Sequence, residues 1–141
     1  MSYLILNIKG NVLDLQAVQE TVKKNAVVLN CLGANVLKGP GWDLCSKGTE
    51  NIVKAMKENG LKKIITCTSL GTGDSYPKCS LFTKFFIWAM ISRPIQDKEV
   101  QEKIIKESGL DFIIIRPTGL TNNPFTGIWH KFKKKNNFLR I

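Results

Sequence analysis

The residues best placed to do chemistry follow a short apolar run in the second half of the chain. The run 112–115 (Phe-Ile-Ile-Ile) is typical of a buried parallel strand, and Arg116, Pro117, Thr118 and Gly119 come directly after it. Proline cannot donate a hydrogen bond to a sheet, so the strand must end there. In open α/β sheets, ligands bind at the loops that leave the carboxyl ends of the strands. The sequence therefore predicts a ligand-facing loop that begins at Arg116.

Metal chemistry and triad hydrolysis have little support in the sequence. The four cysteines, Cys31, Cys45, Cys67 and Cys79, form no CxxC pair, so we predict no metal site. Two of them fall in predicted buried strands, which favours reduced thiols and a cytoplasmic protein. His130 is the only histidine, and no nucleophile-elbow motif accompanies it.

Positive charge gathers at the C-terminal end of this basic chain. The formal net charge is +10, and no acidic residue follows Asp111. The cations beyond that point are Arg116, Lys131, Lys133, Lys134, Lys135 and Arg140. Residues 129–141 could contact nucleic acid or an acidic membrane. We favour the simpler interpretation of a solvated basic tail after a domain at 1–128, and we expect neither nucleic acid nor a membrane as a partner.

Four predicted strands would position the loop at Arg116. They cover residues 4–8, 26–31, 63–68 and 112–115. A helix that Asp14 caps should separate the first two, with Leu15, Val18 and Val22 on one stripe. This alternation of strands and helices predicts an α/β protein with a doubly wound parallel sheet.

Two further helices fill the remaining connections. One begins near Leu44 and ends at Gly60, and its inward positions are Ile52, Val53 and Met56. The other is predicted to begin with Asp97 as its cap and to end at Gly109, and its apolar positions are Val100, Ile104 and Ile105.

Residues 81–91 form an aromatic segment between the third and fourth predicted strands. A helix there would carry a wide apolar face of Leu81, Phe82, Phe85, Phe86, Trp88 and Ala89. Such a face could stack on a flavin or tetrapyrrole ring. We favour an ordinary core-facing or partner-facing stripe. The segment also contains Lys84 and is too short to span a bilayer.

Several short segments together resemble a known family. They are residues 9–14, 31–34, 48–56, 67–69, 107–111, 116–121 and 124–127, in this order. Together they resemble the atypical short-chain dehydrogenase/reductases with NAD(P)-binding Rossmann domains, in particular the biliverdin reductase B or NADPH flavin reductase type and its NmrA-like relatives. The resemblance extends over about residues 4 to 128, so it is much more specific than one short motif.

The resemblance implies positions for a bound NADP or NAD. Asn11 and Val12 would lie beside the adenine, and Leu32, Gly33 and Ala34 would approach the ribose and phosphates. Cys67 would contact the cofactor, while Thr68 and Ser69 would face the nicotinamide and the substrate as the catalytic pair. Pro117, Thr118, Gly119 and Leu120 would line the nicotinamide from the other side. Hydride transfer belongs to the cofactor, and the protein mainly positions the two rings.

The sequence departs from the family pattern at two places. The tyrosine-xxx-lysine dyad of ordinary members is absent, because Ser80 stands four residues after Tyr76. The Gly-x-x-Gly-x-x-Gly turn that holds the pyrophosphate is not found either, so we expect a shortened Rossmann-like domain. The resemblance implies an NAD(P)H-dependent reductase of a small flavin or tetrapyrrole-like substrate. The alternative is a non-catalytic module that senses dinucleotides or binds a partner, with the aromatic segment 81–91 as the partner surface.

Overall fold

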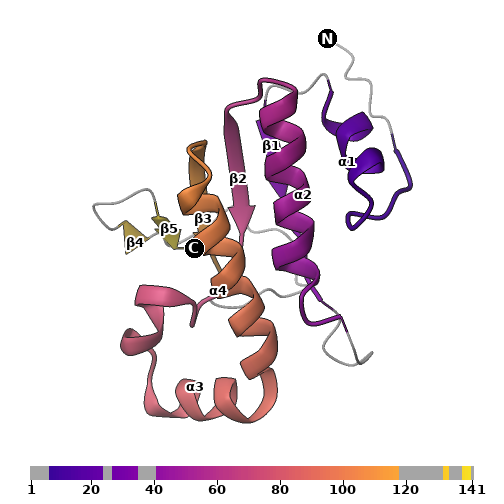
Figure 1. The fold of residues 1–141 in the computed structure, drawn as a ribbon. Helices are drawn as coiled ribbons and strands as arrows, with labels where there is room; N and C mark the ends of the chain where they lie inside the picture. Colours follow the sequence, from indigo (N-terminus) through magenta and orange to yellow (C-terminus); the bar gives the residue numbers. More distant parts are fainter. Residues whose placement is uncertain (1–6, 24–26, 35–40, 118–131, 134–137, 141) are drawn as a thin grey trace.

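A computed structural model describes residues 7–23, 27–34, 41–117, 132–133 and 138–140 of the chain. Within these residues, the strands form one sheet in the order β1-β2-β3-β5-β4, with the helices packed beside it (Figure 1). The strand predicted at 4–8 lies mostly outside the described residues, and Asn7 and Ile8 have no regular structure. The predicted fold class, an α/β Rossmann-like domain with a parallel sheet, is confirmed.

Three predicted strands form the parallel centre of the sheet. They are β1 (Val27–Asn30), β2 (Lys63–Cys67) and β3 (Asp111–Arg116). Between β1 and β2, Asn30 is paired with Thr66. Between β2 and β3, Cys67 is paired with Ile115. Because the strands are parallel and in register, their carboxyl ends lie at the same edge of the sheet.

The basic C-terminal segment contributes two strands that the sequence did not predict. β5 (Phe138–Arg140) pairs in parallel with β3, and β4 (Phe132–Lys133) pairs antiparallel with β5. Their short lengths and the lysines around them hide the apolar pattern that identifies a strand. A tail solvated along its whole length is therefore wrong for these five residues.

The first two helices have the predicted boundaries and inward faces. Asp14 caps α1 (Leu15–Val22) by accepting hydrogen bonds from the backbone amides of Gln16 and Ala17. α2 (Leu44–Glu58) ends before Gly60, whose positive φ of 69° suits a residue without a side chain. The predicted inward residues of the two helices are buried, namely Val18, Val22, Ile52, Val53 and Met56.

The helix predicted from Asp97 is longer than expected and turns a different face inward. α4 (Ser92–Glu107) begins five residues before Asp97, which is buried within the helix. Of the three predicted apolar positions, Ile105 is fully buried but Val100 is exposed. The buried stripe instead contains Asp97, Gln101, Glu102, Ile105 and Ser108. These polar side chains can be buried because each of them has a polar partner.

The aromatic segment is helical and stands apart from the sheet. It forms α3 (Leu81–Phe86) and a π-helical turn (Ile87–Ile91) that leads into α4 (Figure 1). Ile87 is buried against Cys79 and Ile95, and Ile91 packs against the same cluster. Leu81, Phe82, Phe85 and Trp88 are between 65% and 85% exposed. A core-facing stripe is therefore wrong for these four side chains.

The described helices cover one face of the sheet. The main core joins α1, α2 and α4 to the residues of β2 and β3 that point toward them, such as Ile64 and Ile114. Figure 1 shows α2 and α4 side by side over the strands. On the other face, Leu29 is 68% exposed and Ile113 is 40% exposed, with no described helix over them.

Candidate functional site

The ends of β2 and β3 are joined where the predicted site begins. The Thr68 amide donates to the Ile115 carbonyl at 2.8 Å, and the Leu70 amide donates to the Pro117 carbonyl at 3.0 Å. These bonds continue the parallel pairing beyond the strands. The structure therefore brings Cys67, Thr68 and Ser69 beside Pro117, as the family resemblance implies. We call the segment ends 31–34, 67–70 and 116–117 the carboxyl edge.

A lysine that the sequence analysis did not select joins β1 to β2 at this edge. The Lys98 ammonium, from α4, donates to the Leu32 carbonyl at 3.0 Å and to the Cys67 carbonyl at 3.4 Å. Two carbonyl oxygens leave one donor of an ammonium group for another partner. Lys98 therefore places a positive charge at the carboxyl edge, between Leu32 and Cys67.

The predicted adenine end lies beside the first residues of this edge. A methyl group added at Gly48 would come within 2.7 Å of Leu32 and 3.0 Å of Val12, so these two side chains meet over the glycine. Asn51 holds the Val12 carbonyl with a 3.0 Å hydrogen bond. Asn11 is exposed and uses its side chain to accept from the Leu13 amide. Val12 and Asn11 also line a hollow of about 260 Å³ between α1 and β1.

Gly33 leaves open space at the edge. A Cβ built there would meet no atom within 4 Å, and Gly33 and Ala34 follow Leu32 without a turn of helix or strand. A small residue in such a place lets a ligand approach the backbone closely. The position therefore fits the ribose or phosphate contact that the resemblance assigns to it.

The two predicted catalytic hydroxyls have different surroundings. The Thr68 side chain is 5% exposed and donates to a Glu102 carboxylate oxygen at 2.9 Å. The Ser69 hydroxyl is half-buried and donates to the adjacent Leu70 carbonyl at 3.1 Å. Ser69 is therefore the more accessible of the two, while the Thr68 proton is held by the carboxylate.

Glu102 is the centre of a buried ionic cluster behind the edge. Its carboxylate accepts from Arg116 Nε at 2.8 Å and from Arg116 Nη2 at 2.5 Å, so the pair is bidentate. It also accepts from the Thr72 hydroxyl at 2.7 Å. Arg116 Nη1 donates to Asp74 at 2.6 Å. Prediction of Arg116 as a residue of the ligand-facing loop is wrong, since it is the last residue of β3 and is fully buried.

The hydrogen bonds of this cluster decide the ionisation of Glu102. Burial alone raises the pKa of a carboxyl group. At Glu102 this effect is outweighed by hydrogen bonds from Arg116, Thr72 and Thr68 and by the Arg116 charge, so its pKa lies below the ordinary value. Glu102 is therefore a carboxylate that holds the ends of β2 and β3 in place.

This lowered pKa predicts a loss of stability in acid. The stabilisation from Glu102 is complete above the ordinary pKa of 4.5 and disappears as the pH falls through the lower folded-state pKa. Urea unfolding of the protein at a series of pH values should show this loss, and the Glu102→Gln variant should lack that component of it. An unchanged pH dependence in the variant would assign the acid sensitivity to other carboxyl groups.

Asp97 fixes the N-terminus of α2 from the neighbouring helix. Its carboxylate accepts from the Cys45 amide at 2.8 Å and from the Ser46 amide at 3.0 Å. The prediction that Asp97 caps its own helix is wrong, because Asp97 lies within α4 and its carboxylate caps the N-terminus of α2 instead. These two amides are occupied, so they are not available to bind a phosphate group.

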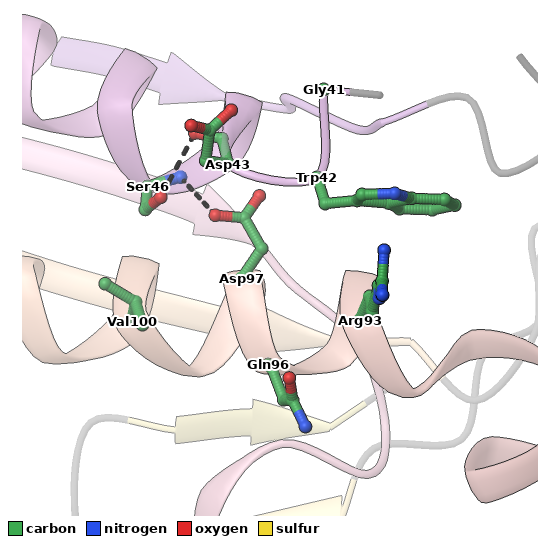
Figure 2. A pocket seen from close by; sticks show the side chains of 8 residues that line it. All are labelled: Gly41, Trp42, Asp43, Ser46, Arg93, Gln96, Asp97 and Val100. Atoms are coloured by element: carbon green, nitrogen blue, oxygen red, sulfur yellow. Dashed lines mark hydrogen bonds between the residues drawn. The ribbon is translucent and has the colours of Figure 1, made fainter. Parts of the chain in front are cut away.

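An open groove lies beside this cap. It has a volume of about 490 Å³ and is lined by Gly41, Trp42, Asp43, Ser46, Arg93, Gln96, Asp97 and Val100. Figure 2 shows the Trp42 ring and the Arg93 side chain on the same side of Asp97. None of the predicted site residues lines it, so the groove is separate from the carboxyl edge.

Some predicted site residues cannot be placed. Thr118, Gly119 and Leu120 lie outside the described residues. Within the described part of the chain, no three His, Cys, Asp or Glu side chains gather where they could hold a metal ion. No helix of that part is long and apolar enough to cross a membrane.

Sequence reasoning missed Lys98 and Glu102. Neither residue belongs to a motif in the sequence. One signal could have found Glu102, because an arginine at the end of an apolar strand needs a buried acid as its partner.

Solved structures of the same fold are longer than this chain. The anaerobillin reductase ChuY from Escherichia coli O157:H7 superimposes with a TM-score of 0.72 at 23% identity, over 93% of this chain and 60% of ChuY. A short-chain dehydrogenase/reductase from Veillonella parvula in complex with NADP gives 0.73 at 15% identity, over 94% of this chain and 58% of that protein. These likenesses establish the fold.

Comparison of sequences gives the family. An uncharacterized chloroplastic protein of Arabidopsis thaliana, At2g34460, is 32% identical over 91 residues, which are 61% of this chain and 31% of that protein. A family model described as NAD(P)H-binding matches residues 5–139, a range that includes the carboxyl edge, the unpredicted strand β4 and all but the last residue of β5. Together with the shared end of three parallel strands, this match shows that the chain belongs to the NAD(P)H-binding family of Rossmann-like proteins.

Proposed function

We propose that the carboxyl edge binds NAD(P)H and that the chain takes part in the reduction of a small flavin or tetrapyrrole-like molecule. The observation that carries the proposal is the Lys98 bridge, which sets a cation between the ends of β1 and β2. The match to an NAD(P)H-binding family and the NADP held by the Veillonella protein support the cofactor. The name of ChuY as an anaerobillin reductase supports a tetrapyrrole-like substrate.

Each proposed contact is the one that the family resemblance implies. Asn11 and Val12 would receive the adenine, and Leu32, Gly33 and Ala34 would receive the ribose and phosphates. The nicotinamide would lie near Cys67, Thr68, Ser69 and Pro117, and we keep Thr118, Gly119 and Leu120 as the far side of its pocket. NAD(P)H would supply the hydride when bound, so the task of these residues is to orient the cofactor and the substrate.

Removal of the Lys98 charge should weaken dinucleotide binding. We expect the Lys98→Met variant to bind NADPH about tenfold more weakly, because a charge-assisted hydrogen bond contributes about 1.5 kcal/mol or more. Nicotinamide fluorescence during titration of the purified chain measures this. Lys103→Met is the matched control, since Lys103 is an exposed lysine on the same helix. Equal affinities for the two variants would contradict a role for Lys98.

The reductase step is tested at Ser69. Its half-buried hydroxyl makes one local hydrogen bond, so Ser69→Ala should leave the fold intact. We expect turnover of flavin or biliverdin with NADPH to fall about tenfold while cofactor affinity changes little, as for a group that contacts the reacting end. Thr68→Val is less specific, because it also removes the hydrogen bond to Glu102. A loss of cofactor affinity without a loss of turnover would show that Ser69 binds the cofactor and does not act at the reacting end.

A second function is favoured by the exposed aromatic side chains of α3 and the following turn. Leu81, Phe82, Phe85 and Trp88 form an exposed apolar surface of the kind that binds a partner. A module that senses dinucleotides and binds a partner through this surface would bind NADPH but reduce neither flavin nor biliverdin. The same titration therefore separates the two functions. A cytoplasmic location remains a prediction from the free cysteines.

A further inference from the structure

Two cysteines stand next to each other at the ends of neighbouring strands. The parallel register of β1 and β2 extends to the pair of Asn30 and Thr66, and the residues that directly follow this pair are Cys31 and Cys67. Neighbouring strands are about 4.8 Å apart. This separation lies within the range of about 4.4 to 6.8 Å between the Cα atoms of a disulfide. The backbone therefore permits a bond between the two sulfurs.

Both side chains point to the same, open face of the sheet. Asn30 and Thr66 are buried against the helices, and Asn30 donates to Thr49 of α2 at 2.9 Å. Successive side chains of a strand alternate between faces, so Cys31 and Cys67 point away from the helices. That is the face on which Leu29 is 68% exposed. Cys31 is exposed and Cys67 is half-buried, so a small reagent can reach the pair.

The charges near Cys67 act on its thiol in opposite directions. Burial raises the pKa of the Cys67 thiol, the charge of Cys31 raises it further, and the Lys98 ammonium lowers it. A negative charge on Cys31 therefore disfavours a second negative charge on Cys67. Cys31 is the better first nucleophile because it is exposed, and Lys98 favours the thiolate of Cys67 in a second step.

We propose that Cys31 and Cys67 form a dithiol that glutathione disulfide oxidises to an intramolecular disulfide. The Cys31 thiolate attacks one sulfur of glutathione disulfide, whose bond breaks to release one glutathione thiolate. The Cys67 thiolate then attacks the Cys31 sulfur of the mixed disulfide and releases the second glutathione. Two cysteine thiols lose two electrons, one glutathione disulfide gains them, and the two thiol protons end on the two glutathione molecules. This site does not depend on the proposed function.

The other two cysteines are internal controls. Cys45 is 1% exposed and Cys79 is 9% exposed, and both lie within the helical layer rather than on the open face. Buried thiols in such places react slowly. Oxidation at the proposed site should therefore be selective.

Peptide mapping of the oxidised full chain tests the proposal. The protein is incubated with increasing glutathione disulfide, quenched with an alkylating reagent, and digested without reduction. We expect the mass of the protein to fall by two hydrogens. We also expect to find a peptide that links Cys31 to Cys67, and to find Cys45 and Cys79 alkylated. A wild-type chain that keeps glutathione on Cys31 without the link, or that links Cys31 to Cys45, would overturn the proposal. This measurement needs no variant to fold.

Single variants sharpen the result. Cys67→Ser should accumulate a stable mixed disulfide at Cys31, because the resolving thiol is gone. Cys31→Ser should form no intramolecular disulfide and react more slowly overall. Cys79→Ser, a matched control at a buried thiol, should form the link at the wild-type rate. Link formation in either of the first two variants would show that other cysteines are involved.

Discussion

Arg116→Met is expected to lower the free energy of unfolding by about 3 to 5 kcal/mol, because the buried Glu102 carboxylate loses its bidentate partner and keeps only the half-exposed Lys106 ammonium at 3.2 Å. Arg116 is fully buried and Glu102 is 1% exposed, so water cannot replace the lost interaction. The bidentate pair also joins α4 to the end of β3, behind Thr68. Urea unfolding followed by circular dichroism measures the change.

A double variant distinguishes a lost ion pair from a general packing defect. Glu102→Leu/Arg116→Met removes the buried carboxylate together with the buried guanidinium, so part of the stability lost in the single variant should return. The exposed pair of Lys47 and Asp43 provides the control, and Lys47→Met should leave the unfolding curve unchanged. A double variant less stable than Arg116→Met would mean that the cost comes from the cavity and not from the charge.

Asp97→Ala is the second large effect, with an expected loss of about 2 to 3 kcal/mol. The substitution removes both acceptors of the Cys45 and Ser46 amides, which are buried and have no water to bind instead. It also removes a negative charge from the positive end of the α2 dipole. Hydrogen exchange of these two amides should become much faster than in the wild-type protein.

Two substitutions at comparable acids complete this test. Asp97→Asn keeps one oxygen acceptor, so it should lose less stability than Asp97→Ala. Asp43 precedes α2 directly but makes no side-chain capping bond, and it is largely exposed. Asp43→Asn should therefore have no effect on the exchange of the Cys45 and Ser46 amides. If Asp43→Asn were the more harmful variant, the cap would come from the helix's own boundary residue.

The two buried acids act on the same edge of the sheet. Asp97 holds the start of α2, while Glu102 holds Thr68 and Arg116. Lys98, between them on α4, joins Leu32 to Cys67. A single helix therefore positions the ends of β1, β2 and β3. We expect substitutions on the inward side of α4 to change dinucleotide binding even where they touch no ligand.

The sequence alone determined the elements whose signals are local. The apolar run of β3, the stripe of Val18 and Val22 and the glycine that ends α2 each depend on a few neighbouring residues. The order of these elements predicted the parallel sheet, and the shared carboxyl ends predicted where Cys67, Ser69 and Pro117 would meet.

Only the tertiary structure decided which face of α4 is buried and what Arg116 does. Hydrophobicity favoured Val100 over Glu102, because a charged residue is costly to bury unless a partner is present. The partner of Glu102 is Arg116, at the end of β3. The amides that Asp97 binds belong to α2. The strand at Phe138 also forms by pairing with β3 rather than from its own pattern. Interactions between distant segments leave no periodic trace in the sequence, so they were visible only after the chain had folded.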